Sequence, residues 1–186
     1  MTVRGAARGS RRERRESIGI VGAGPAGLAA AEQLRRKGYQ VTIYDRYDRV
    51  GGLLIYGIPN FKLEKEIVQR REALLRASKV AFELACDVGR DVPLVELRER
   101  HDAMLLATGV YEARKIVAPG IGLPGIAAAL DYLTASNRIG LGDHVPAFDS
   151  GALDAKGKNV VVLGGGDTAM DCVRTAVRQG ARTVKC

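Results

Sequence analysis

The 186-residue sequence lacks several features that would assign it to a familiar class. It has no tryptophan, six tyrosines, three phenylalanines and only three cysteines. Because Cys86, Cys172 and Cys186 lie far apart and form no C-x-x-C pair, the chain alone predicts neither a disulfide framework nor a zinc or iron–sulfur site. No run approaches the roughly 18 to 20 apolar residues that cross a bilayer, and no apolar segment follows the N-terminus as in a secretory signal. We therefore expect a cytoplasmic protein that binds no membrane.

Positive charge is unevenly distributed along the chain. The formal net charge is +8, and residues 1–16 contribute half of it through six arginines and two glutamates. Such a segment can bind nucleic acid or an acidic membrane surface. No aromatic residue lies among these arginines to stack on bases, so we interpret residues 1–16 as a basic tail or linker and expect no nucleic-acid partner.

Glycine is the residue type in excess. The chain has 23 glycines, about 12% of its length, against roughly 7% in average proteins. The hydrophobic fraction of 46% is that of a globular protein, so the glycines do not indicate disorder. Many of them stand in short clusters directly after apolar runs, where strands are expected to end.

The chain reads as alternating strands and helices. Residues 17–21 are apolar, residues 25–37 are good helix formers that stop at Gly38, and residues 39–45 are β-branched and aromatic. This is a right-handed βαβ unit. The remaining pattern predicts a helix at 63–77, strands at 80–84 and 102–107, a helix at 126–137, a loop at 138–157, a strand at 159–163, a helix at 167–179 and a strand beginning at 183. The predicted fold class is therefore α/β with two Rossmann-like units, the second of them incomplete.

The first glycine cluster has the spacing of a dinucleotide-binding loop. Gly22, Gly24 and Gly27 form G-x-G-x-x-G between a predicted strand and helix. The first glycine allows the tight turn, the second lets the backbone approach a pyrophosphate, and the third allows close packing of helix on strand. Asp45 ends the second strand, at the distance expected for an acid that binds an adenosine ribose.

A second cluster repeats this arrangement near the end of the chain. Gly164, Gly165 and Gly166 separate a predicted strand from a predicted helix, and Asp167 or Thr168 can cap that helix. The exposed amides of a helix N-terminus attract a second diphosphate. The side chains that distinguish a 2′-phosphate from a free ribose follow the next strand and lie beyond residue 186.

The motifs together resemble one family. The strings GGLL at 51–54, YGIPNFKLEK at 56–65, ATG at 107–109 and GGGDTAMDC at 164–172 resemble the glutamate synthase small subunit and its relatives, over residues 18–186. The resemblance implies an FAD-dependent, NADPH-dependent oxidoreductase. Residues 17–150 would form the first part of its FAD-binding domain, and residues 158–186 the start of an inserted NAD(P)-binding domain. We accordingly expect a piece of a longer protein, lacking the family's N-terminal iron–sulfur domain and its C-terminal part and inactive by itself.

The resemblance also implies roles for particular residues. Gly22, Gly24 and Ala26 would face the FAD pyrophosphate, Asp45 the ribose and Val88 the adenine. The whole expected FAD site comprises Gly22, Gly24, Pro25, Ala26, Gly27, Asp45, Gly52, Leu53, Lys62, Val88, Thr108 and Gly109. The expected NADPH site comprises Gly164, Gly165, Gly166, Asp167 and Thr168. Leu53 and Val88 could instead be ordinary core residues, and Lys62 a solvated surface charge.

No catalytic side chain is expected, because hydride transfer takes place between the two cofactors. His101 and His144 are isolated in the sequence. The resemblance implies that electrons pass from FAD through iron–sulfur clusters to a large subunit that makes glutamate from glutamine and 2-oxoglutarate. The alternatives are a related flavoprotein that reduces a ferredoxin-type acceptor, a disulfide reductase of the same plan, and a non-catalytic flavin-binding piece. A disulfide reductase needs a pair of redox cysteines, and residues 53–63 contain none.

Overall fold

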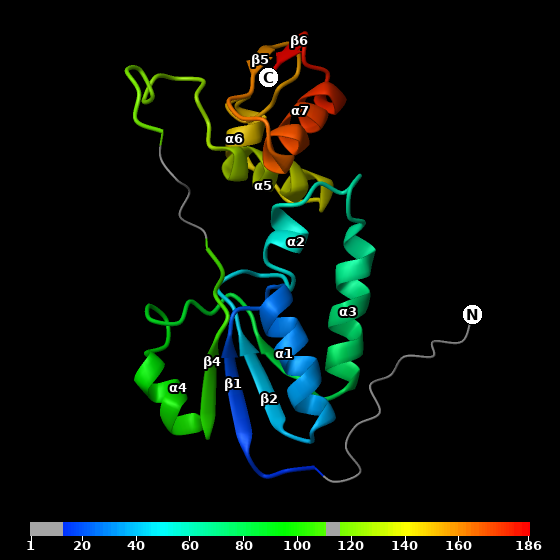
Figure 1. Cartoon of the computed structure of the whole chain (residues 1–186), viewed down its shortest axis with the longest axis vertical. Helices are drawn as coiled ribbons and strands as arrows, with labels where there is room; N and C mark the ends of the chain where they lie inside the picture. Colours follow the sequence, from blue (N-terminus) through cyan, green and yellow to red (C-terminus); the bar gives the residue numbers. More distant parts are fainter. Residues whose placement is uncertain (1–12, 111–115) are drawn as a thin grey trace, which may run out of the picture. The chain divides into compact units, whose positions relative to one another are not determined.

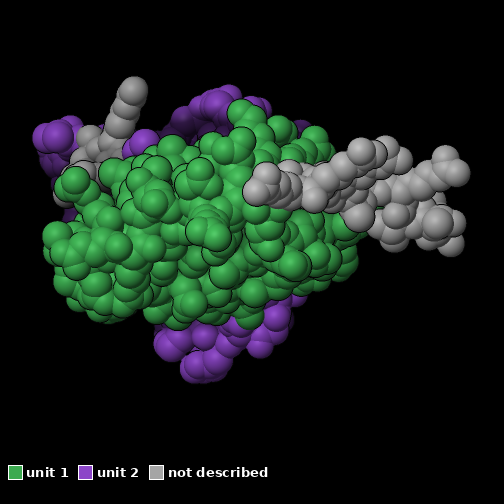
Figure 2. Space-filling view, turned by 90° about the horizontal axis from the view of Figure 1, so that it is seen from below, with its two compact units in different colours: residues 1–55, 64–109 green, residues 56–63, 110–186 purple. Residues whose placement is uncertain are grey.

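The computed structural model describes residues 13–110 and 116–186, and the chain divides into two compact units (Figure 2). Unit 1 comprises residues 1–55 and 64–109, and unit 2 comprises residues 56–63 and 110–186. The chain therefore leaves unit 1 after Ile55, returns to it at Glu64, and leaves it again after Gly109. The assignment of residues 17–150 and 158–186 to two different cofactors stays a prediction.

Unit 1 contains a parallel four-stranded sheet in the order β3-β2-β1-β4 (Figure 1). Its strands are β1 (Ser17–Val21), β2 (Gln40–Tyr44), β3 (Ala81–Glu83) and β4 (Ala103–Leu106). Ser17 pairs with Gln40 and Val21 with Tyr44, so β1 and β2 are in register along their full length. The strand order turns back at β1, with β2 on one side and β4 on the other, which is where α/β sheets bind their ligands.

Helices α1 (Pro25–Arg36) and α3 (Lys65–Ala77) pack beside each other in unit 1 (Figure 1). Pro25 begins α1, because the amide that proline lacks has no partner in a first turn, and Gly38, at φ 94°, follows its end. The core between α1 and the sheet contains Ile20, Leu28 and Ile43, each at most 3% exposed. The predicted βαβ unit is confirmed.

Two short helices were not expected from the sequence: α2 (Leu53–Tyr56), whose last residue belongs to unit 2, and α4 (Leu94–Arg100) of unit 1. Four residues are too few to show a helical period, and α4 has only seven. Strand β3 is also shorter than predicted, covering three residues instead of residues 80–84. Such differences at element ends reflect fraying and short pairing, and leave the topology unchanged.

Unit 2 contains α5 (Ala129–Gly140), α6 (Pro146–Asp149), β5 (Asn159–Val161), α7 (Asp167–Gln179) and β6 (Thr183–Lys185). Strands β5 and β6 pair in parallel, and α7 connects them (Figure 1). The helix predicted at 126–137 was placed three residues early at both ends. The loop predicted at 138–157 was wrong in part, since it contains the end of α5 and all of α6. Pro146 begins α6 and supplies the fixed φ of a first turn.

The end of the predicted basic tail contacts unit 1. Residues 1–12 lie outside the described residues, but Glu13 forms an ion pair with Arg35 at 2.6 Å. The Arg14 amide donates to the Gly38 carbonyl at 2.9 Å, and the Arg14 guanidinium lies 4.7 Å from the centre of the Tyr39 ring. Residues 13 and 14 are thus bound at the C-terminal end of α1.

Candidate functional site: two glycine loops at helix N-termini

The first glycine loop lies at the carboxyl ends of the strands of unit 1. The Gly22 amide donates to the Tyr44 carbonyl at 2.8 Å, and the Ala107 amide to the Val21 carbonyl at 2.8 Å. The ends of β1, β2 and β4 are therefore joined directly before the loop. Ligands of open parallel sheets bind at this edge, beside the strand where the order turns back.

The glycines at the two ends of the loop are required by its packing. A Cβ on Gly22 would lie 2.3 Å from the Ala107 oxygen, and its φ of 115° is in the region that favours glycine. A Cβ on Gly27 would lie 1.9 Å from the Gly22 oxygen. These contacts confirm a tight turn and a close approach of α1 to β1, and neither position admits another residue without backbone movement.

Gly24 differs, because no atom lies within 4 Å of the position that its Cβ would occupy. Its φ of −75° is also open to any residue. Gly24 is the N-cap of α1 and offers no side-chain cap to the first amides of the helix. Pro25 and Ala26 are exposed beside it. Open space above uncapped helix amides is the arrangement that suits a diphosphate, so the first loop fits the phosphates of a dinucleotide.

Asp45 is 8% exposed and holds the loop from the end of β2. Its Oδ2 accepts from the Ala23 amide at 2.5 Å, and its Oδ1 accepts from the Tyr47 amide at 2.9 Å. A carboxylate has about four acceptor sites, so these two bonds leave capacity for ribose hydroxyls. The sequence indicated an acid for the ribose and did not indicate that the same acid would fix the loop.

Other predicted residues of the FAD site lie around this edge of the sheet. The Gly51 amide donates to the Ala23 carbonyl at 2.9 Å, which places the Gly52 and Leu53 turn next to the loop. Gly52 has a φ of 53°, and Leu53 is 38% exposed, so it is not the core residue considered above. On the other side, a Cβ on Gly22 would lie 3.2 Å from the Thr108 nitrogen.

The edge is extended by the segments that follow β3 and β4. The Cys86 amide donates to the Asp45 carbonyl at 2.9 Å, and half-buried Val88 forms a parallel bridge with Val92, four residues later. Gly109 is exposed, with a φ of 70°. The structure therefore gathers the predicted residues of unit 1, and their contacts with a cofactor stay predictions.

The second loop, in unit 2, is more open than the first. Gly164 has a φ of 135°, and its Cβ position would lie 3.6 Å from the Ala169 Cβ, an ordinary contact. Around Gly165 and Gly166 no atom lies within 4 Å of the Cβ positions. Gly166 is the N-cap of α7 and offers no side-chain cap, while Asp167 and Thr168 are exposed in the first turn. This loop also fits a diphosphate.

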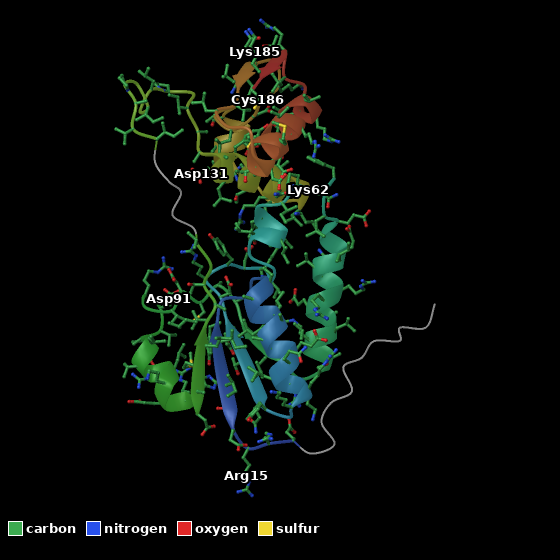
Figure 3. All side chains as sticks on the ribbon, viewed as in Figure 1. Arg15, Lys62, Asp91, Asp131, Lys185 and Cys186 are labelled. Atoms are coloured by element: carbon green, nitrogen blue, oxygen red, sulfur yellow. The ribbon has the colours of Figure 1, made fainter. Side chains whose placement is uncertain are left out.

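Lys62 is the predicted FAD residue that belongs to unit 2 (labelled in Figure 3). Its Nζ lies 3.2 Å from Oδ1 and 3.1 Å from Oδ2 of Asp171, in α7. Lys62 is thus an ion-paired residue, and its side chain is still 40% exposed to solvent. Nothing in the sequence pattern indicates this partner, which is 109 positions away.

A second lysine was missed by the sequence reading. Lys65, the first residue of α3, is 5% exposed, and its Nζ donates to the Leu54 carbonyl of α2 at 3.1 Å. Burial lowers the pKa of Lys65 to about 8. Its place in the charged run 62–65 suggests a surface residue, which is why the sequence did not single it out.

The histidines form ordinary polar contacts. His101 lies between the Tyr44 hydroxyl, 2.9 Å from Nε2, and the Ser17 hydroxyl, 3.1 Å from Nδ1, and burial lowers the pKa of His101. His144 is exposed and pairs with Asp149 at 2.9 Å.

The cysteines are not joined by a disulfide. Cys86 is half-buried, Cys172 buried and Cys186 exposed, and burial raises the pKa of Cys172 to about 11. A thiol with a raised pKa is a poor nucleophile. Among the described residues, no group of three potential metal ligands was found.

The fold and the two loops define an α/β protein built to bind dinucleotides. The family model for pyridine nucleotide-disulphide oxidoreductases matches residues 16–185, and this chain belongs to that family. The resemblance noted in the sequence is confirmed, since the chain is 66% identical over 170 residues to the glutamate synthase (NADPH) small chain of Azospirillum brasilense. It is 47% identical over 169 residues to the protein of the same name from Bacillus subtilis.

The chain spans about a third of the length of these curated relatives. The match covers 91% of this chain but 35% of the Azospirillum protein and 34% of the Bacillus protein. Among solved structures, Mycobacterium tuberculosis FprA in complex with NADPH is similar with a TM-score of 0.76 and 27% identity, over 92% of this chain and 42% of that one. The predicted α/β fold class, with Rossmann-like nucleotide-binding units, is confirmed.

One further prediction concerns the membrane. Within residues 13–110 and 116–186, none of the helices has the length and apolar character needed to span a bilayer.

Proposed function

We propose that this chain supplies the FAD-binding and NADPH-binding loops of a glutamate synthase small chain. The main supporting observation is the first loop, where open space at Gly24 adjoins the uncapped N-terminus of α1. FAD is assigned to unit 1 because Asp45 and the Gly52–Leu53 turn, to which the resemblance gives roles in FAD binding, lie beside that loop. Bound there, FAD would accept hydride equivalents and release them as single electrons.

NADPH is assigned to the second loop, in unit 2. The support is the open glycine run before α7 and the similarity to FprA, which was solved in complex with NADPH. In this proposal Gly165 and Gly166 admit the diphosphate, and the first amides of α7 bind it. Asp167, at the same helix end, would accept from a hydroxyl group, since its negative charge repels phosphate.

The proposal extends to the destination of the electrons. The name 'small chain' of the relatives implies a large-subunit partner. In this proposal the partner forms glutamate, and the electrons reach it through iron–sulfur clusters. The three cysteines described above stand apart and would not bind such a cluster, so the clusters would belong to other parts of the assembly. A cytoplasmic location agrees with three cysteines that form no disulfide.

A spectroscopic titration tests the cofactor assignment. Because the 186 residues are expected to be inactive by themselves, a protein of the relatives' full length that contains them is titrated with FAD. The bound fraction is followed by quenching of flavin fluorescence and by the visible absorbance of the flavin. NADPH is then added without oxygen. We expect FAD to bind and its visible absorbance to fall when NADPH is added. FAD binding without reduction by NADPH or NADH would favour a flavin-binding piece with no catalytic role.

A mixing experiment tests the partner. The same full-length protein is combined with a glutamate synthase large chain, and the mixture is separated by size. Co-migration is expected, and glutamate formation from glutamine and 2-oxoglutarate should depend on NADPH. If the chain instead reduces a ferredoxin and does not associate with the large chain, the related ferredoxin-reducing flavoproteins become the better assignment.

A further inference from the structure

Residues 56–63, which we call segment 56–63, connect two stretches of unit 1 but belong to unit 2. Both flanking residues, Ile55 and Glu64, belong to unit 1, whereas the segment itself belongs to unit 2. A loop of eight residues that joins two elements of one unit would ordinarily pack on that unit. Specific side chains of helices α5 and α7 bind segment 56–63 within unit 2.

Helix α5 contacts the start of the segment. Asn137, 6% exposed, donates its Nδ2 to the Tyr56 carbonyl at 2.8 Å. The neighbouring Arg138 guanidinium lies 4.6 Å from the centre of the Tyr56 ring, and Tyr56 is 2% exposed. A buried backbone carbonyl needs a hydrogen-bond donor, and Asn137 provides it. This end of the segment is held by neutral and cation–π contacts.

Helix α7 contacts the end of the segment. The Arg178 guanidinium lies 3.9 Å from the centre of the Phe61 ring, and two turns earlier in α7 Asp171 binds Lys62 through both carboxylate oxygens. The side chain of Asp171 is 7% exposed and that of Lys62 is 40% exposed. The carboxylate is thus removed from water, and the ammonium of Lys62 is the counter-charge that the structure provides.

The position of Asp171 in α7 places the Lys62–Asp171 pair near the proposed nucleotide site. Asp171 lies four residues after Asp167, the first residue of the helix, a rise of about 6 Å from the N-terminus where the diphosphate is proposed to bind. Lys62 follows the Gly52–Leu53 turn, beside the first loop, by ten residues. A partly exposed pair of this kind contributes little to stability, because solvent screens it. Its contribution is therefore to be sought in position rather than in folding energy.

We infer that Asp171 is a positioning residue, which fixes the Lys62 ammonium and with it segment 56–63 against the first turns of the nucleotide-binding helix α7. This inference rests on the proposed function, since it assigns the pair a part in hydride transfer from NADPH to FAD. Bound in this way, segment 56–63 would hold Lys62, which the resemblance assigns to the flavin, in a fixed position on α7. Loss of the pair should then slow the transfer step more than it weakens NADPH binding.

The test compares Asp171→Asn with the wild type in the same full-length protein. The amide is of similar size but carries no charge, and Glu72→Gln, which breaks the exposed Glu72–Arg76 ion pair in α3 at 2.8 Å, is the matched control. In anaerobic stopped-flow experiments we expect Asp171→Asn to reduce the limiting rate of flavin reduction about tenfold. The NADPH concentration for half-maximal rate should change less than about twofold, and Glu72→Gln should match the wild type.

A variant in which Lys62 and Asp171 exchange their charges tests whether the rate depends on the ion pair itself or on the identity of each residue. In the double variant Lys62→Asp with Asp171→Lys, a pair of opposite charges is restored, and the rate should recover relative to Asp171→Lys alone. An unchanged rate in Asp171→Asn, or an equal loss in rate and in NADPH affinity, would overturn the positioning role.

A measurement without cofactors keeps this inference separate from the proposed function. The amides of Lys62 and Leu63 donate to the Pro59 carbonyl at 2.9 and 3.1 Å and should be protected from hydrogen exchange. In Asp171→Asn, their exchange should accelerate about tenfold, and in Glu72→Gln it should not change. If NADPH fails to reduce the wild-type flavin, the proposed function fails. If exchange at these two amides is unaffected, it is the attachment of segment 56–63 through Asp171 that fails.

Discussion

The two glycine loops share one sequence pattern but differ in what surrounds them. In unit 1, Gly22 and Gly27 are enclosed by backbone atoms, and Asp45 and Gly51 bind the loop through the amide and carbonyl of Ala23. In unit 2, buried Ala169 stands at the position of Gly27, the Cβ position of Gly164 lies 3.6 Å from its side chain, and those of Gly165 and Gly166 have no atom within 4 Å. The first loop is part of the packing of its unit, whereas the second is a surface left free.

Glycine can be required at a position for two different reasons, which the structure distinguishes and the sequence does not. A glycine enclosed by backbone is required for folding whether or not a ligand binds. A glycine that faces open space is required only if something else must approach it. Gly24, Gly165 and Gly166 are of the second kind, and they are the positions where ligand binding can be disturbed without unfolding the chain.

The largest effect is expected at the enclosed glycines. Gly27→Ala would place a Cβ 1.9 Å from the Gly22 oxygen, so the backbone must move, and we expect a loss of about 3 kcal/mol or more in the free energy of unfolding. Urea denaturation measures it. Gly24→Ala is the control and should stay within about 0.5 kcal/mol of the wild type, since it meets no atom and keeps an ordinary φ. Equal stability of the two variants would remove the distinction between the loops.

Asp45→Ala should have the next largest effect. It leaves the amides of Ala23 and Tyr47 without their acceptor, and charge-assisted hydrogen bonds of this kind contribute roughly 1.5–3 kcal/mol each before relaxation. We expect a loss of about 2 kcal/mol in stability together with weaker FAD retention. Denaturation and FAD titration of the same preparation measure both. Lost FAD affinity at full stability would show that Asp45 acts on the ribose alone, and the reverse would show that it acts on the loop alone.

Lys65 should make the free energy of unfolding of unit 1 depend on pH. Its pKa is lowered by burial from 10.5 to about 8, so between these values the unfolded chain binds the proton and the folded chain does not. The contribution of Lys65 to stability should therefore rise with pH, by up to about 1.4 kcal/mol per pH unit above pH 8, and be flat below it. Urea denaturation from pH 7 to 9.5 on the wild type and Lys65→Met tests this. The difference between the two curves should change with pH, because other groups titrate equally in both.

The smallest change in stability is expected in the second loop. Gly165→Ala adds a methyl group to open space, so stability and FAD affinity should be unchanged. If NADPH binds there, its affinity should fall about tenfold, close to 1.4 kcal/mol. Titration of the FAD-loaded variant with NADPH measures the affinity. Wild-type affinity would place the nucleotide away from this loop and leave the first loop as the only assigned site.

The sequence predicted the elements whose patterns are long and regular. Helices α1 and α7 and the strands before them were found because glycine, proline and apolar periodicity all agree there. Helices α2 and α4 were missed because they are too short to show a period, and α6 because proline and glycine around it indicated a loop. The candidate residues of unit 1 were placed well because adjacent parallel strands end at one edge of the sheet.

The α/β class, both glycine loops and the family can be inferred from the amino-acid sequence, since each depends on residues close together in the chain. The folded structure was needed to show that Asp45 binds the Ala23 amide of the loop, that Lys62 pairs with Asp171, and that Lys65 is buried. These are contacts between residues separated by up to 109 positions, or burial that follows from such contacts. The local sequence pattern indicates the conformation of a residue and of its near neighbours. Charge pairing and burial depend on which element, distant in the sequence, packs beside that residue in the folded chain.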